Sequence, residues 1–226
     1  MFEGFTEETR EFLWGIALHN ERGWFLEHKA QYERALKVPF SALAAETAAG
    51  MREKHPETEV QIHVSRIYRD ARRLYGRGPY KDRLWFTLKP GSGEMSGPMF
   101  WFEIWAAGYG VGLGFYDATA AQMELFRRSV RENPGPLERL ARSFEAQDRF
   151  ELWGDLYARP KGEMGPLLDP WYNRRRLGML YEENFGGDLL SPDLPRILAE
   201  DYESLMPYYR YLAAFDVPEL RDRYRR

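Results

Sequence analysis

The chain has 226 residues, of which 44% are hydrophobic and 15% aromatic, and its formal net charge is -3 at pH 7. It is long enough to bury a sizeable hydrophobic core, and we expect a single globular domain over residues 1–226. The sequence contains no cysteine, which excludes disulfides, cysteine-ligated zinc and a catalytic thiol.

The first quarter of the chain, residues 1–55, has the spacing of amphipathic helices. Apolar residues recur at helical spacing over residues 7–18, and Thr6 is placed to cap that helix. A second helix is expected to open at Asn20, and a further helical stretch covers residues 40–52.

Residues 60–116 change to the alternating pattern of β-strands. We expect an antiparallel sheet of about four or more strands, with the glycine- and proline-rich run 89–98 as a hairpin turn. The strands are predicted at residues 60–64, 84–89, 99–105 and 109–116.

Residues 118–226 are expected to be mainly helical. Asp117 is placed to cap one helix, and a last helix is expected after Ser191 and Pro192. The order of helices, sheet and helices predicts an α+β fold in which N-terminal and C-terminal helices flank the sheet.

The basic residues are unevenly placed. Between residues 66 and 83 the chain has seven basic and two acidic side chains, although its total charge is negative. Like charges at close range repel by about 1 kcal/mol per pair in water, and by more where they are partly buried. The fold must therefore supply carboxylates to this segment, or the segment binds an anion. The basic residues are Arg66, Arg69, Arg72, Arg73, Arg77, Lys81 and Arg83, and the acidic ones are Asp70 and Asp82.

Asp70 lies among arginines whichever structure the segment adopts. As a strand, the segment would place Asp70 on one face with Arg66 and Arg72. As a helix, it would place Asp70 beside Arg69 and Arg73. In either case an aspartate here is suited to orient guanidinium groups toward a phosphate or carboxylate.

A glycine-containing turn follows this basic run and ends in Tyr80 and Lys81. The turn is residues 75–81, YGRGPYK, in which Gly76 and Gly78 permit a tight backbone approach. It therefore presents Tyr80 and Lys81 next to the arginines.

Four blocks of this sequence resemble the signature segments of the family known as domain of unknown function 2461, which is found in bacteria and fungi. The blocks are NERGWFLEHKAQYE (20–33), SRIYRDARRLYGRGPYK (65–81), GVGLGFYDATAAQMELFRRSVREN (110–133) and RPKGE (159–163). The family is described as uncharacterised, so the resemblance implies signature positions and no activity. These positions are Asn20, Trp24, Phe25, Lys29, Tyr32, Arg66, Arg69, Asp70, Arg72, Tyr80 and Lys81. Residues 73–78 depart from the family's usual turn.

Our preferred hypothesis is a pocket that binds a ligand bearing phosphate or carboxylate. In it, arginines and Lys81 hold the anion, Asp70 orients the arginines and Tyr80 donates a hydrogen bond. Trp24 is also compatible with core packing, and Lys29 with a solvated surface position. The candidate ligand-binding residues are Trp24, Lys29, Arg66, Arg69, Asp70, Arg72, Tyr80 and Lys81.

Two other functions remain open. The same arginines could pair with the acidic helices in a structural or interaction protein, or the basic groups 174–176 and 221–226 could contact nucleic acid. No known catalytic motif is present, the four histidines form no ligand pattern, and we predict neither a metal nor a cofactor. A nuclease-like pair of Asp70 and Glu103 lacks the lysine expected two residues later. Whether the protein is an enzyme, and its oligomeric state, stay open.

The location predicted from the sequence is the cytoplasm. The first residues lack the basic leader of a secretory signal. The most apolar run, 99–116, is interrupted by Glu103 and several glycines, so we expect no membrane span.

Overall fold

The computed structural model describes residues 1–92 and 94–221. The helices are α1 (Glu7–Leu18), α2 (Arg22–Glu27), α3 (Lys29–Gln31), the π-helix η1 (Tyr32–Lys37), α4 (Val38–Lys54), the 3-10 helix η2 (Ala71–Arg73), α5 (Ala120–Glu132), α6 (Gly135–Glu145), α7 (Asp169–Tyr172), the 3-10 helix η3 (Gly187–Leu190), α8 (Leu194–Ala213) and the 3-10 helix η4 (Pro218–Leu220). The strands are β1 (Val60–Val64), β2 (Arg83–Pro90), β3 (Met99–Trp105), β4 (Gly108–Gly114), β5 (Glu151–Trp153) and β6 (Gly178–Asn184).

The strands form a six-stranded sheet in the order β1-β2-β3-β4-β6-β5. Neighbours pair antiparallel: Val60 of β1 lies opposite Pro90 of β2, and Glu151 of β5 lies opposite Leu180 of β6. The fold class is therefore α+β with an antiparallel sheet, and helices precede and follow the strands in the sequence, as predicted.

By their contacts the described residues cluster into two compact units. The first unit is drawn from Met1–Gly93, Trp101–Val111 and Glu182–Glu203. The second is drawn from Glu94–Phe100, Gly112–Tyr181 and Ser204–Arg226. That residues 1–226 form one domain stays a prediction.

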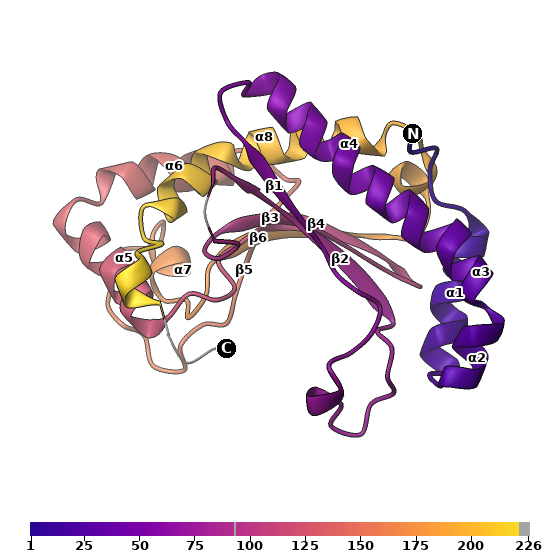
Figure 1. Cartoon of the computed structure of the whole chain (residues 1–226). Helices are drawn as coiled ribbons and strands as arrows, with labels where there is room; N and C mark the ends of the chain where they lie inside the picture. Colours follow the sequence, from indigo (N-terminus) through magenta and orange to yellow (C-terminus); the bar gives the residue numbers. More distant parts are fainter. Residues whose placement is uncertain (93, 222–226) are drawn as a thin grey trace. The chain divides into compact units, whose positions relative to one another are not determined.

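In the first unit α4 packs against β1 and β2, as Figure 1 shows for the violet helix and strands. The contact is aromatic: Phe40 of α4 meets the ring of Phe86 on β2 at 5.5 Å and that of Phe102 on β3 at 5.9 Å, and all three rings are fully buried. Edge-to-face and tilted ring pairs of this kind add to the stability gained from burial alone. This core is the support from which β1 and β2 extend toward the loop between them.

The helical segment between α3 and α4 is π-helical. In it the backbone N–H of Val38 donates to the carbonyl of Glu33, five residues earlier. The carbonyl of Ala35 in this segment accepts the buried hydroxyl of Thr9 on α1 at 2.6 Å. The π-turn thus ties α1 to the helix that leads into α4.

The second unit has its own aromatic core. Phe126 of α5 meets Phe215 edge to face at 5.5 Å, and Phe144 of α6 meets Tyr208 at 5.7 Å in the same geometry. Tyr208 lies in the C-terminal half of α8, which continues through Pro207.

Several sequence predictions can be compared with these elements. The four predicted strands correspond to β1 through β4, and the first helix has its predicted bounds. The predicted cap at Asp117 is wrong, because Thr119 caps α5: its hydroxyl accepts the backbone N–H of Gln122 at 3.2 Å. Strand β6 was not predicted. No helix in residues 1–92 and 94–221 is long and apolar enough to cross a membrane.

Candidate functional site

The basic segment forms the loop between β1 and β2, residues 65–82, which Figure 1 shows extending beyond the ends of the two strands. The base of the loop is closed by an antiparallel bridge between Tyr68 and Tyr80. Next to it, the backbone N–H of Lys81 donates to the carbonyl of Ile67 at 2.7 Å. The loop is therefore an ordered extension of the β1–β2 pair.

The part of this loop that contains Asp70 is neither a continuous strand nor an α-helix. After the bridge at Tyr68, the chain enters the short η2 helix, and Asp70 is its N-cap. The Asp70 side chain accepts the backbone N–H of Arg72 at 3.0 Å. A capping aspartate competes with the strand ladder for the backbone, so the alternation expected of a strand ends at this residue.

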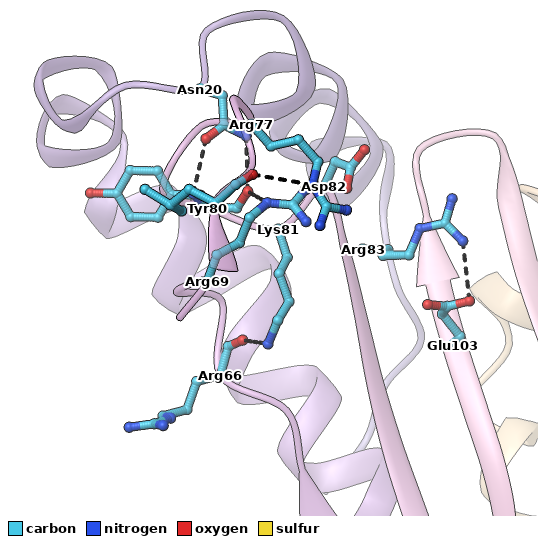
Figure 2. A network of polar contacts seen from close by, with 10 residues as sticks. Asn20, Arg66, Arg69, Arg77, Tyr80, Lys81, Asp82, Arg83 and Glu103 are labelled. Carbon is cyan, nitrogen blue, oxygen red and sulfur yellow. Dashed lines mark hydrogen bonds and ion pairs between the residues drawn. The ribbon is translucent and has the colours of Figure 1, made fainter. Parts of the chain in front are cut away.

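Asn20 holds the returning arm of the loop (Figure 2). Its Nδ2 donates to the carbonyl of Tyr80 at 3.0 Å, and its Oδ1 accepts the N–H of Tyr80 at 2.9 Å. The same carbonyl receives the Nε–H of Arg69 at 2.6 Å. At Gly78 any Cβ would overlap the Asn20 side chain, so glycine is required there.

The ring of Tyr80 belongs to an aromatic cluster. It is only 4% exposed and stacks on Phe25 of α2 at 4.3 Å, with Tyr68 at 5.4 Å. Burial raises the pKa of Tyr80 above its ordinary value. The structure thus uses the ring to anchor the loop on α2, and the backbone of Tyr80 to receive Asn20 and Arg69.

Beside this anchored arm lies a hollow of about 330 Å³, which we call the basic hollow. Its lining has four cationic side chains and one carboxylate. The lining residues are Arg69, Arg77, Lys81, Asp82, Arg83 and Trp85. Their arrangement is shown in Figure 2, apart from Trp85, which is not labelled there.

Arg69 is the most firmly held cation of the hollow. Its guanidinium pairs with Asp82 at 3.0 Å while its Nε donates to the Tyr80 carbonyl, and its side chain is 18% exposed. Charge-assisted hydrogen bonds of this kind are about twice as strong as neutral ones. Arg69 is therefore part of the wall of the hollow as well as a source of charge.

Lys81 lies against an aromatic ring. Its ammonium is 4.3 Å from the ring centre of Trp85 and donates to the backbone carbonyl of Arg66. Burial lowers the pKa of Lys81, and the positive charges of Arg66 and Arg69 lower it further. Lys81 is thus a partly buried cation with two arginines nearby.

The other two cations of the hollow, Arg77 and Arg83, are exposed. Arg83 pairs with Glu103 of β3 at 3.3 Å, and burial raises the pKa of Glu103 although Arg83 acts in the opposite direction. Arg77 is exposed, and its Nε makes only a 3.5 Å contact to the carbonyl of Leu74. Of the four cations that line the hollow, Arg77 thus has the weakest contacts with other protein groups.

Among the residues predicted to bind a ligand, Arg69 and Lys81 are brought together in the hollow. Arg66 contributes its carbonyl, while its exposed side chain points away in Figure 2. Asp70 and Arg72 pair with each other at 2.8 Å, and both are exposed. Asp70 therefore orients Arg72, and Asp82 orients Arg69.

The two candidates from the N-terminal helices lie elsewhere. Trp24 stacks on His28 at 4.0 Å with nearly parallel rings and also contacts Phe12. Lys29 is exposed on α3. Neither residue lines the basic hollow.

Sequence reasoning did not select four residues that line the hollow, namely Arg77, Asp82, Arg83 and Trp85. A signal was present, since Arg83 and Trp85 are two apart on β2 and therefore share a face. In the part of the chain that the structure describes, no three His, Cys, Asp or Glu side chains are grouped to hold a metal ion. Residues 222–226 of the basic tail lie outside the described residues.

Comparison with known proteins assigns the chain to a family. No curated protein matched the chain. The family described as "Conserved hypothetical protein (DUF2461)" matches residues 8–211, which include Asn20, the β1–β2 loop and the basic hollow. The chain therefore belongs to the conserved hypothetical protein family DUF2461.

Proposed function

We propose that the basic hollow binds a small anionic ligand that bears a phosphate or carboxylate group. The observation that carries this proposal is the charge of the lining, where four cations surround a hollow with one carboxylate. A bound anion would stabilise the cations by about 1 kcal/mol per close pair at full solvent screening, and by about 4 kcal/mol in the weaker screening near a protein surface.

The geometry suits an anion with an attached carbon framework. Guanidinium groups present planar, paired donors to the oxygens of phosphate or carboxylate, and Arg77 has such donors to spare. Trp85 adds a half-buried aromatic wall against which an apolar part of the ligand could pack.

The alternative is that these arginines serve structure alone. Three ion pairs support it, and their acids come from the loop itself or from β3 rather than from the acidic helices: Arg69–Asp82, Arg72–Asp70 and Arg83–Glu103. Within the described residues, however, neither Arg77 nor Lys81 has a carboxylate partner. Lys81 has structural partners in the Arg66 carbonyl and the Trp85 ring, so Arg77, whose Nε makes only a 3.5 Å contact, is the cation that favours an anion site.

Calorimetric titration with inorganic phosphate, pyrophosphate and malonate tests the proposal. Arg77→Gln removes an exposed cation of the hollow and should weaken binding about tenfold or more, as expected for losing one charge-assisted hydrogen bond. Arg72→Gln is the matched control, because Arg72 lies on the same loop but pairs with Asp70 outside the hollow. It should change affinity less than twofold.

Two results would overturn the proposal. One is the absence of saturable binding for all three anions, and the other is an equal loss of affinity in Arg77→Gln and Arg72→Gln. Binding should also weaken as salt is added, because part of it is Coulombic. A cytoplasmic location is part of the proposal, and the cysteine-free sequence supports it.

A further inference from the structure

We propose that the second unit contains a separate oxyanion site around Tyr157. This site shares no residue with the basic hollow and goes beyond the function proposed for it. We call it the Tyr157 cluster; it consists of Tyr157 with the side chains of Arg127, Lys161 and Arg175.

A short backbone ladder positions the ring. The N–H of Tyr157 donates to the carbonyl of Asn173 at 3.0 Å, and the N–H of Arg175 donates to the carbonyl of Asp155 at 2.7 Å. Between these bonds, Leu156 and Arg174 form an antiparallel bridge. The two chain segments that carry Tyr157 and Arg175 are therefore fixed side by side.

The side chain of Asn173 fixes the turn that carries Lys161. Its Oδ1 accepts the backbone N–H of Lys161 at 2.7 Å, and its Nδ2 donates to the carbonyl of Gly162 at 3.1 Å. Asn173 is itself only 8% exposed. The position of Lys161 is thus built into the fold by a buried amide.

Three cationic side chains lie close to the ring of Tyr157. The Nζ of Lys161 lies 4.5 Å from the ring centre of Tyr157, the Cζ of Arg127 lies 5.4 Å from it, and the Cζ of Arg175 lies 6.0 Å from it. A tyrosine ring attracts each cation, but it carries no net charge and cannot cancel their mutual repulsion.

The carboxylate that pairs with Arg127 is shared with a second arginine. Arg127, on α5, donates from Nε to Glu124 at 3.0 Å, and Arg131 donates to the same carboxylate at 2.8 Å. Their hydrogen bonds, with that of Arg131 the larger, lower the pKa of Glu124. Among the described residues no carboxylate forms an ion pair with Lys161 or Arg175. The cluster therefore has more positive than negative charge.

Arg127 supplies an independent sign of a missing partner. Its side chain is 3% exposed, and its buried Nη1 has no hydrogen-bond acceptor in the described part of the chain. Buried guanidinium donors are normally satisfied, so the unpaired Nη1 of an arginine that also faces the Tyr157 ring supports an acceptor oxygen as its missing partner. The ligand class is a compact oxyanion, with inorganic phosphate and phosphate monoesters as its two sources.

The test is a titration of the ¹⁵N-labelled full chain followed by NMR. Sodium phosphate and a nucleoside monophosphate are added in separate experiments, with sodium chloride at matched ionic strength as the reference. Saturable shifts of the Lys161 and Gly162 amides and of the Arg127 Nε–H signal are expected. Saturation by both compounds indicates recognition of the phosphate alone, and tighter binding of the ester indicates contacts beyond it.

Three variants make the test specific. The double variant Lys161→Gln/Arg175→Gln changes two exposed side chains and should abolish the shifts, whereas Arg128→Gln, an exposed arginine beside Arg127 on α5, should keep them. Arg77→Gln should also keep them, because it affects only the basic hollow. The proposal is overturned if chloride produces the same shifts, if the double variant retains them, or if Arg77→Gln abolishes them. Failure of anion binding at the hollow leaves these shifts unchanged, so the two proposals fail separately.

Discussion

Replacing Asn20 by alanine is expected to destabilise the protein by releasing the loop that forms the basic hollow. The substitution removes two hydrogen bonds that join Asn20 to the backbone of Tyr80. These two residues lie 60 positions apart in the sequence, so the pair connects the N-terminal helices to the loop.

The loss of stability can be worked out from the hydrogen-bond partners that the backbone of Tyr80 keeps after the substitution. The carbonyl of Tyr80 keeps the Nε–H of Arg69 at 2.6 Å, so its loss is one net hydrogen bond, about 1 kcal/mol. The N–H of Tyr80 loses its acceptor in a partly buried place, which costs about 1–3 kcal/mol. The free energy of unfolding of Asn20→Ala should therefore fall by about 2–4 kcal/mol.

Urea unfolding followed by tryptophan fluorescence measures this change. Asn20→Asp is the informative companion, because its carboxylate keeps an acceptor for the Tyr80 N–H but turns its second oxygen toward the Tyr80 carbonyl oxygen. The ionised carboxylate repels that carbonyl, whereas the protonated carboxyl can donate to it, so Asn20→Asp should gain stability relative to Asn20→Ala as the pH is lowered. The reasoning is refuted if Asn20→Ala unfolds within about 0.5 kcal/mol of the wild type, or if the stability difference between Asn20→Asp and Asn20→Ala does not depend on pH.

Three further outcomes are expected in urea unfolding. Gly78→Ala should lose about 1–3 kcal/mol, because its Cβ would overlap Asn20, whereas Gly23→Ala, with open space around it in α2, should be neutral or slightly stabilising. Phe25→Ala, at a fully buried ring, should lose about 3–5 kcal/mol, and a loss below 1 kcal/mol would show that the aromatic cluster does not anchor the loop. Burial lowers the pKa of Lys81 from its ordinary 10.5, so on raising the pH the folded protein loses the Lys81 proton before the unfolded chain does. The stability of the wild type relative to Lys81→Met should therefore rise as the pH increases toward 10.5. A difference that does not depend on pH would contradict this.

A strand is most readily predicted where apolar and polar residues alternate, so that the sequence itself shows which face is buried. In β2 every second residue is buried, from Leu84 to Pro90, so the alternation identifies the strand. In β6 the last three residues are exposed and polar, two of them glutamates, and only Gly178, Met179 and Tyr181 are buried. That pattern is too short to distinguish a strand from a loop without its neighbours.

At the candidate site, the composition indicates which segment of the chain is basic but not which of its side chains line the hollow. The excess of arginines marks the segment that forms the β1–β2 loop, yet which of them face the hollow depends on how Asn20 and Phe25 hold the returning arm of that loop. Tyr80 was expected to face a ligand because it follows a glycine turn. Its ring instead packs on Phe25, a contact set by tertiary structure that no local pattern records.

The π-helix η1 has a consequence for how this chain can change in length. A π-turn holds one residue more than an α-turn, so deleting one residue within Tyr32–Lys37 would restore ordinary helical bonding and leave α4 facing the same way. Deleting one residue within α4 would instead rotate everything after it by about 100° and turn Leu43 or Met51 out of the core. Relatives that are one residue shorter before α4 should therefore have a regular α-helix here and an unchanged β1–β2 core.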